Sequence, residues 1–180
     1  MPKDVIIAQL RDVFRRYGYE GSSLAKISAA TGLGRASLYH YFPKGKEEMA
    51  ATVLGHIAVE LEEHLLKPLK GEGEPITRIQ AMVKTLDQFY NCGHSSCFLD
   101  ILSIGEAQTL FQSTIRQIVS AWINSLTEVL VEAGQEPKLA RQRAEDAIIR
   151  IQGALVLCRC CENTAPFQQV LAKLPENLGL

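Results

Sequence analysis

The chain has 180 residues and 47% of them are apolar, so it can bury a sizeable core and is not an intrinsically disordered sequence. Its net charge of -1 argues neither for nor against nucleic acid. The charge is unevenly distributed, since residues 1–50 carry eight Lys and Arg against five Asp and Glu, whereas residues 51–180 carry eleven against fifteen. A basic head on an acidic body is typical of a DNA reader with a separate regulatory body, although small imbalances are common.

No membrane or export segment is expected. The longest candidate apolar run, Gly153 to Cys158, is far shorter than the roughly 20 residues that cross a bilayer. Charged residues interrupt every short apolar run at the N-terminus, unlike a secretory signal. We therefore expect a cytoplasmic protein without a membrane partner. Its five cysteines are expected to be reduced thiols, because an odd number cannot pair completely.

Hydrophobic residues recur at helical spacing, and no run shows the alternation expected of a strand, so the sequence predicts an all-α fold of about nine helices. The expected helices span residues 3–17, 24–31, 35–41, 46–66, 76–91, 97–104, 109–133, 138–162 and 167–174. Gly18 is expected to end the first helix, and helical spacing places Tyr17 on the buried face of that helix. Pro175 is expected to close the last helix.

The segment SLAKISAATGLGRASLYHYF, residues 23–42, fits two short helices joined by a tight turn, the arrangement of a helix-turn-helix DNA-reading unit. The hydroxyl of Ser23 can cap the first of these helices, and Gly32 permits a positive φ in the turn. The small residues Ala29 and Ala30 are expected to let the two helices cross closely.

The expected recognition helix, residues 35–41, keeps Leu38 inward and turns most of its other side chains outward. An Arg at its start can reach guanine or phosphate, Ser and His can donate or accept at base edges, and Tyr more often contacts phosphate. The outward residues are Arg35, Ala36, Ser37, Tyr39, His40 and Tyr41. A plain three-helix bundle is the alternative, because helix-turn-helix spacing alone has many false positives.

A longer stretch, GSSLAKISAATGLGRASLYHYFPKGKEEM over residues 21–49, closely resembles the DNA-binding signature of the TetR family of bacterial regulators. Most members have one residue between the Phe-Pro pair and the following Lys, whereas Lys44 and Gly45 intervene here. This longer form resembles the LmrA/YxaF branch, and QGALVLCRCCENTAPFQQVLAKL, residues 152–174, is similar to the C-terminal helices of that branch. The resemblance covers nearly the whole chain.

The resemblance implies a DNA-binding transcriptional regulator, most commonly a homodimeric repressor released from a palindromic double-stranded operator by a small, largely apolar effector. Ser23 and Lys46 match the family positions at helix starts that hold phosphates, which agrees with the attraction of helix N-termini for anions. The two recognition helices of a dimer would lie on the order of 34–36 Å apart. We place a three-helix DNA-binding domain at residues 1–46 and an all-helical ligand-sensing and dimerisation domain at residues 47–180.

The helices expected between residues 76 and 133 carry large apolar side chains that could line a small-molecule cavity. The candidate lining residues are Met82, Leu86, Phe89, Tyr90, Phe98, Leu102, Phe111, Ile118 and Trp122. Ordinary core packing is the alternative for any one of them.

The last two expected helices mix small and large apolar residues, so two helices from each subunit could form a four-helix interface. The residues expected at this interface are Ala147, Ile151, Ala154, Leu155, Phe167, Val170 and Leu171. The alternative is that these helices pack only within their own subunit.

The cysteines lie in two groups, Cys92 and Cys97 around a loop and Cys158, Cys160 and Cys161 on one helix. They could form a thiol switch or bind a soft metal, which is a second hypothesis for the sensor. The CxCC spacing on one helix points the thiols in different directions and is not that of a structural zinc site, so we assign no metal.

No GxSxG, P-loop, HExxH or Rossmann glycine pattern occurs in the sequence. We therefore predict no enzymatic activity and no cofactor. An all-helical small-molecule enzyme or carrier with a vestigial head remains a distant alternative.

Overall fold

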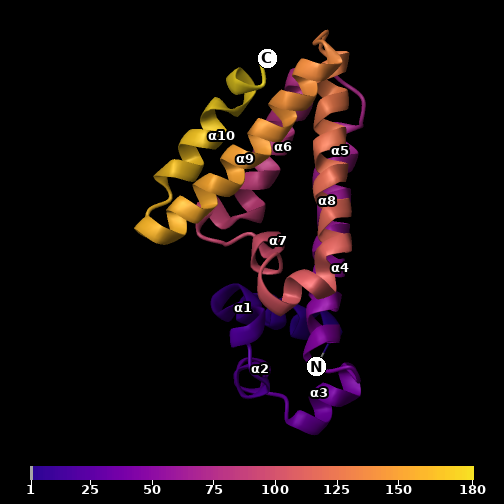
Figure 1. The fold of residues 1–180 in the computed structure, drawn as a ribbon, viewed down its shortest axis with the longest axis vertical. Helices are drawn as coiled ribbons and strands as arrows, with labels where there is room; N and C mark the ends of the chain where they lie inside the picture. Colours follow the sequence, from indigo (N-terminus) through magenta and orange to yellow (C-terminus); the bar gives the residue numbers. More distant parts are fainter. Residues whose placement is uncertain (1) are drawn as a thin grey trace. The chain divides into compact units, whose positions relative to one another are not determined.

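The computed structural model describes residues 2–180, and these are helical with no strand among them (Figure 1). The α-helices are α1 (Lys3–Gly21), α2 (Leu24–Thr31), α3 (Arg35–Tyr41), α4 (Lys46–Leu61), α5 (Lys67–Leu69), α6 (Pro75–Phe89), α7 (Phe98–Ile101), α8 (Gly105–Glu132), α9 (Pro137–Cys161) and α10 (Ala165–Asn177). The predicted all-α fold is confirmed, and the bounds of α2 and α3 agree with those expected from the sequence.

The described residues form two compact units that do not correspond to a single division of the chain. The head unit comprises the described residues up to Val59 together with Phe98–Ile115, and the body unit comprises Glu60–Cys97 and Arg116–Leu180. The helices α4 and α8 therefore contribute residues to both units. The functional boundary expected at residue 46 falls within the head unit and stays a prediction.

A kink near the end of α1 determines which aromatic residues enter the core of the head unit. Gly18 has a φ of 69° and a ψ of 178°, so the helical register breaks there. Tyr17, which helical spacing predicted to be buried, is 39% exposed, whereas Tyr19 is 3% exposed. The prediction for Tyr17 was wrong: its ring lies beside the Lys26 ammonium and lines a groove between α1 and α2 instead of entering the core.

The body unit is built around α6, α9 and α10. Helix α10 packs along α9 and also against α6. Side chains such as Leu86, Ile151 and Phe167 are fully buried between these helices. The ring of Tyr90 meets that of Phe167 edge to face, with ring centroids 5.7 Å apart.

Several helix ends differ from those expected: α1 continues to Gly21, α7 covers only Phe98–Ile101, α8 already begins at Gly105, and two helices extend further at their C-terminal ends. A π-helical turn, Glu62–Leu66, follows α4 and leads into α5, so helical backbone continues to Leu69. Helix α10 continues through Pro175, where it was expected to stop. Proline fits the φ of a helix, and the following turn is retained because the Leu178 N–H donates to the Leu174 carbonyl at 3.0 Å and the Leu178 side chain is fully buried.

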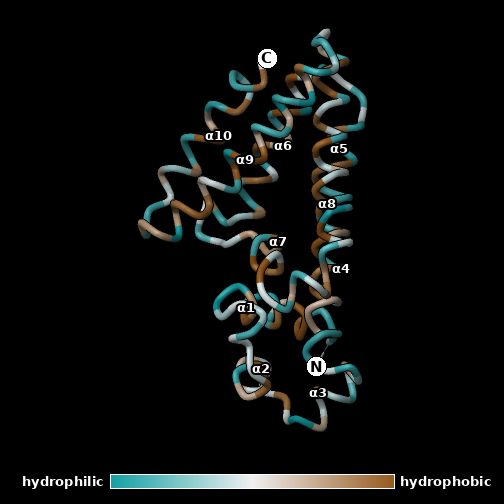
Figure 2. The backbone as a smooth tube through the Cα atoms, viewed as in Figure 1, coloured by the Kyte–Doolittle hydropathy of each residue, from teal (hydrophilic) through white to brown (hydrophobic). Residues whose placement is uncertain are grey.

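Apolar and polar residues are mixed along the described helices. Figure 2 shows hydrophobic and hydrophilic residues alternating in short stretches along the helices. No helix within residues 2–180 is long and apolar enough to cross a membrane.

Arg78 joins three segments of the body unit. Its side chain is only 7% exposed, its Nη1 donates to the Leu69 carbonyl at 2.9 Å, and its Nη2 forms an ion pair with Glu132 of α8. We expect Arg78→Ala to lower the free energy of unfolding by about 1–3 kcal/mol, because it leaves the carbonyl of the fully buried Leu69 without its donor, whereas the half-exposed Glu132 carboxylate is solvated and contributes little. Urea denaturation followed by circular dichroism measures this change.

The matched control is Lys67→Ala, which removes an exposed pair between Lys67 and Glu63 one helical turn apart. Exposed pairs of this kind contribute about 0.3–0.5 kcal/mol. Equal effects of the two substitutions would show that Arg78 does not hold these segments together.

Candidate nucleic-acid interface

Side-chain hydrogen bonds fix the turn between α2 and α3. Gly32 adopts a left-handed conformation with a φ of 67° and ends α2. The Thr31 hydroxyl donates to the Ile27 carbonyl at 2.8 Å and accepts from the Leu33 N–H at 3.3 Å. The Ser28 hydroxyl donates to the Leu33 carbonyl at 2.6 Å. This turn therefore holds α3 at a defined angle to α2. The hydrogen bonds of Ser28 and Thr31 were not predicted from the sequence.

The N-terminus of α2 is capped as the sequence predicted. The Lys26 N–H donates to the Ser23 hydroxyl oxygen at 3.3 Å. Ser23 itself is exposed, so the other amides of this first turn are accessible to an anion.

Helix α3 offers most of the side chains expected of a recognition helix to solvent. Leu38 and the following Phe42 are fully buried and attach it to the head unit. Exposed residues are Arg35, Ala36, Ser37, Tyr39 and His40. Tyr41 is only half-buried, because its ring lies against His40 and Phe42 at centroid distances of 5.8 and 6.4 Å.

The inserted Gly45 supports the recognition helix. Gly45 has a φ of 68°, and a Cβ atom built there would lie 3.5 Å from the Tyr39 ring. The guanidinium of Arg35 lies over the same ring, 5.8 Å from its centroid. Tyr39 thus connects the first residue of α3 with the turn that precedes α4.

Lys46, the first residue of α4, is held by an aromatic ring. Its ammonium lies 4.2 Å from the centroid of the Tyr19 ring. That ring stacks on Phe14 at 6.2 Å and meets Phe111 edge to face at 5.9 Å. Burial, and then the nearby charges of Glu106 and of two other glutamates, raise the pKa of Tyr19, so the ring stays neutral. The cation is therefore oriented before any anion arrives.

Glu20, the residue that follows Tyr19 in the sequence, is held by a hydrogen bond to the start of α8. Its carboxylate accepts a hydrogen bond from the Glu106 N–H at 2.8 Å, in the first turn of α8. Its own backbone N–H, then those of Glu106 and Ala107, and finally the charge of Lys46 lower the pKa of Glu20 below the ordinary value of 4.5. Glu20 is therefore a carboxylate at neutral pH.

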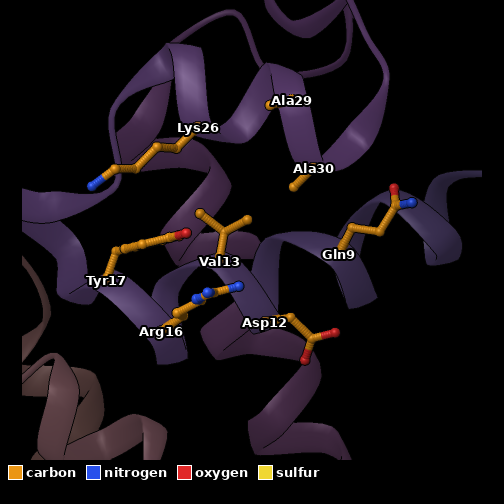
Figure 3. Close-up of a pocket in the computed structure, with 8 residues that line it drawn as sticks. All are labelled: Gln9, Asp12, Val13, Arg16, Tyr17, Lys26, Ala29 and Ala30. Atoms are coloured by element: carbon orange, nitrogen blue, oxygen red, sulfur yellow. The ribbon is translucent and has the colours of Figure 1, made fainter.

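A groove between α1 and α2 adds cations near the capped end of α2 (Figure 3). It has a volume of about 430 Å³ and is lined by Gln9, Asp12, Val13, Arg16, Tyr17, Lys26, Ala29 and Ala30. The Lys26 ammonium lies 4.1 Å from the Tyr17 ring centroid and donates to the Gly21 carbonyl at 2.8 Å.

Two expectations change with this groove. Ala29 and Ala30 are exposed and line it, rather than letting α2 cross α3 closely, because their side of α2 faces α1. Lys26 was not among the expected site residues. Its position three residues after the cap Ser23, in the first turn of α2, could have indicated a cation near the proposed phosphate site.

The candidate ligand-pocket residues are divided between the units. Phe98, Leu102 and Phe111 belong to the head unit, whereas Met82, Leu86, Phe89, Tyr90, Ile118 and Trp122 belong to the body unit. All are buried except Phe89 and Ile118, which are partly exposed. The four grooves described in the structure are lined by other residues, so the effector site stays a prediction.

Most residues expected at the dimer interface lie inside the subunit. Ala147, Ile151, Ala154, Leu155, Phe167 and Leu171 are at most 4% exposed, and Val170 is partly exposed. They are covered because α9, α10 and α6 pack on one another. The large exposed apolar side chains of α9 are Leu139, Ile149, Val156 and Leu157, at 41%, 68%, 38% and 53%.

The cysteines remain free thiols and do not form one cluster. Cys97 and Cys158 are buried, whereas Cys92, Cys160 and Cys161 are exposed. The Tyr90 hydroxyl donates to the Cys97 Sγ at 3.5 Å. In the described part of the chain, no group of three or more His, Cys, Asp or Glu side chains is placed to hold a metal ion.

Comparisons with known proteins agree with this geometry over nearly the whole chain. The chain is 22% identical over 180 residues to the HTH-type transcriptional regulator LmrA of Bacillus subtilis (strain 168), covering 98% of this chain and 96% of LmrA. It is 26% identical over 177 residues to the HTH-type transcriptional repressor DhaR of Mycobacterium sp. (strain GP1), covering 92% and 86%. The matched relatives are regulators and not enzymes, as predicted.

Solved structures show the same fold. A TetR transcriptional regulator from Legionella pneumophila superposes with a TM-score of 0.82 at 20% identity, covering 98% of this chain and 96% of that one. A TetR-family regulator from Agrobacterium tumefaciens gives a TM-score of 0.79 at 23% identity, covering 96% and 95%.

The family models cover both parts of the chain. Residues 6–53 match the model of bacterial regulatory proteins of the tetR family, and residues 75–173 match the C-terminal domain of LmrA/YxaF-like transcriptional regulators. The second match alone spans more than half of the sequence. The chain therefore belongs to the TetR family of bacterial transcriptional regulators, in its LmrA/YxaF-like branch.

Proposed function

We propose that this regulator is a homodimeric repressor that binds a palindromic operator through α3 and is released by a small, largely apolar effector. The observation that carries the DNA-binding part is the exposed surface of α3 between two helix N-termini, that of α2 capped by Ser23 and that of α4 beginning at Lys46. Helix N-termini and fixed cations hold phosphates, while an exposed helix of polar side chains reads base edges.

The base-reading and phosphate-holding roles predict different effects of substitution. Arg35 is exposed at the start of α3, and Lys46 is held over Tyr19 at the start of α4. We expect Arg35→Ala to cost about 1–3 kcal/mol and to relax sequence preference at one position of each half-site. We expect Lys46→Ala to weaken binding to all duplexes and to reduce the salt slope by about one.

The measurement is fluorescence anisotropy with a duplex that the protein has selected from a random-sequence pool, repeated at several salt concentrations. Lys67→Ala, which removes an exposed cation of the body unit, is the control and should leave affinity unchanged. Failure of the unaltered protein to prefer any selected duplex over random duplex at moderate salt would refute the proposed function.

A second copy of the chain is the proposed partner of α9 and α10. Ile149 and Leu157 are exposed apolar residues on α9, and a groove of about 430 Å³ between α9 and α10 is lined by Gly153, Ala154, Leu157 and Val170 together with polar residues. Exposed apolar patches next to a groove are typical of protein interfaces. A two-fold interface would also match the symmetry of a palindromic operator.

The dimer predicts a strong effect of a charge at Ile149. Ile149→Glu is expected to convert the protein to monomers at micromolar concentration, because it would bury a carboxylate without a partner. Multi-angle light scattering measures the mass, and operator affinity should fall with it. Ile104→Glu is the matched control, because Ile104 is 64% exposed against 68% for Ile149 but lies in the head unit. Dimers that survive Ile149→Glu would count against this interface.

Trp122 is the strongest point of support for an effector site. Its side chain is 2% exposed, and its Nε1–H has no hydrogen-bond acceptor among the described residues. Buried indole N–H groups normally have a partner, so a ligand with an acceptor oxygen or nitrogen would satisfy this one.

Because Trp122 is the only tryptophan, its emission reports on its surroundings directly. Compounds that release the protein from the selected duplex are expected to change this emission at the same concentrations. Trp122→Phe, which keeps an aromatic ring but removes the donor, should weaken release at least tenfold while leaving operator affinity unchanged, since a lost hydrogen bond of about 1.4 kcal/mol is a factor of ten. Release without any change of emission would place the effector elsewhere.

A further inference from the structure

The N-terminus of α8 is capped by a residue from a distant part of the head unit. The Glu20 carboxylate accepts the Glu106 N–H at 2.8 Å although the two residues are 86 positions apart in the sequence. The first amides of a helix have no partner within it, and a carboxylate there also interacts favourably with the helix dipole. This cap gives the 28-residue helix α8 a fixed starting point in the head unit.

The cap depends on the absence of a side chain at Gly105. A Cβ atom at this position would lie 2.3 Å from Glu20 Oε1 and 2.9 Å from Glu20 Cδ. Gly105 also has a φ of 64°, a conformation that side chains disfavour. The carboxylate of Glu20 therefore occupies the space that a side chain at position 105 would need.

The segment that contains Glu20 also contains or contacts the two proposed phosphate anchors, Ser23 and Lys46. On one side of it, Tyr19 lies under the Lys46 ammonium and contacts Phe111 of α8. On the other side, Ser23 caps α2, and the buried Ser22 fixes the backbone by donating to the Gly18 carbonyl at 2.5 Å. Two contacts, Glu20 with Glu106 and Tyr19 with Phe111, thus tie one short segment to the first turns of α8.

We propose that Glu20 is a positioning residue that ties the N-terminus of α8 to the phosphate anchors Ser23 and Lys46, so that moving the start of α8 changes operator affinity. The inference rests on the DNA-binding function proposed above and specifies how that site is regulated. Coupling of this kind is reciprocal, so operator binding stabilises the capped end of α8 to the same extent. An effector that acts on α8 would reach the DNA-binding surface through this contact.

A purely electrostatic role for Glu20 makes the opposite prediction. Glu20 is an acidic residue near the Lys46 anchor, and as a bystander it would repel the phosphates of DNA. Neutralising it would then strengthen binding. If Glu20 is a positioning residue, the wild-type side chain favours operator binding, and removing it lowers operator affinity. The sign of the effect separates the two roles.

The test is Gly105→Ala, which leaves every charge in place and displaces the Glu20 carboxylate from the α8 amides. Gly134→Ala is the matched control, because Gly134 also has a positive φ, 88°, but has open space around its Cβ position. With the selected duplex we expect Gly105→Ala to lower affinity about tenfold, within the usual range of coupling between sites, and Gly134→Ala to leave it within about twofold.

Hydrogen–deuterium exchange supplies a second readout that does not depend on the stability of either glycine variant. In the unaltered protein, exchange over residues 105–111 should slow when the duplex is added. In Glu20→Ala these amides should exchange faster and should no longer respond to the duplex, and operator affinity should fall. Glu20→Gln should be intermediate, because its amide oxygen can still accept a hydrogen bond.

Three outcomes would overturn the inference while leaving the proposed function intact. They are equal operator affinity for Gly105→Ala and Gly134→Ala, tighter binding by Glu20→Gln, and exchange over residues 105–111 that ignores the duplex in a protein that binds it. If the unaltered protein selects no duplex at all, both the proposed function and the inference are refuted.

Discussion

The arrangement of the head unit depends on one backbone constraint, the positive φ of Gly18. Because the helical register of α1 breaks there, Tyr19 turns into the core, whereas Tyr17, which directly precedes the break, is exposed. Tyr19 then supplies the ring beneath Lys46 and the contact with Phe111. The same break brings Glu20 to the first turn of α8 and places Ser23 at the start of α2. A residue with a Cβ atom at position 18 would oppose all of these contacts at once.

The sequence predicted the local features that depend on nearby residues. The bounds of α2 agree with the prediction because a hydroxyl cap, Ser23, and a glycine stop, Gly32, lie directly beside it. Those of α3 agree because Gly34 precedes it and Pro43 follows closely after it. The buried positions Leu38 and Phe42 follow from helical spacing in the same way. In contrast, the extent of α10 beyond Pro175 depends on the burial of Leu178 against other helices, which no local signal contains.

Features that depend on distant residues could not be predicted. The start of α8 is stabilised by Glu20, which precedes Glu106 by 86 positions, and the periodicity of α8 does not reveal it. Helical spacing placed Ile151 and Phe167 on apolar faces, but it could not distinguish packing within the subunit from contact with a second subunit. Composition likewise describes the head as basic, whereas the site itself places an acid, Glu20, beside the cation Lys46.

The empty Cβ position of Gly105 links the evolution of two codons that lie far apart in the gene. In a relative with a side chain at the position of Gly105, the acid at the position of Glu20 has to turn away from the amides of α8, since the two side chains cannot occupy the same volume. That movement costs little in sterics but gives up the cap on α8. A glycine at position 105 is therefore expected wherever an acid at position 20 serves as this cap.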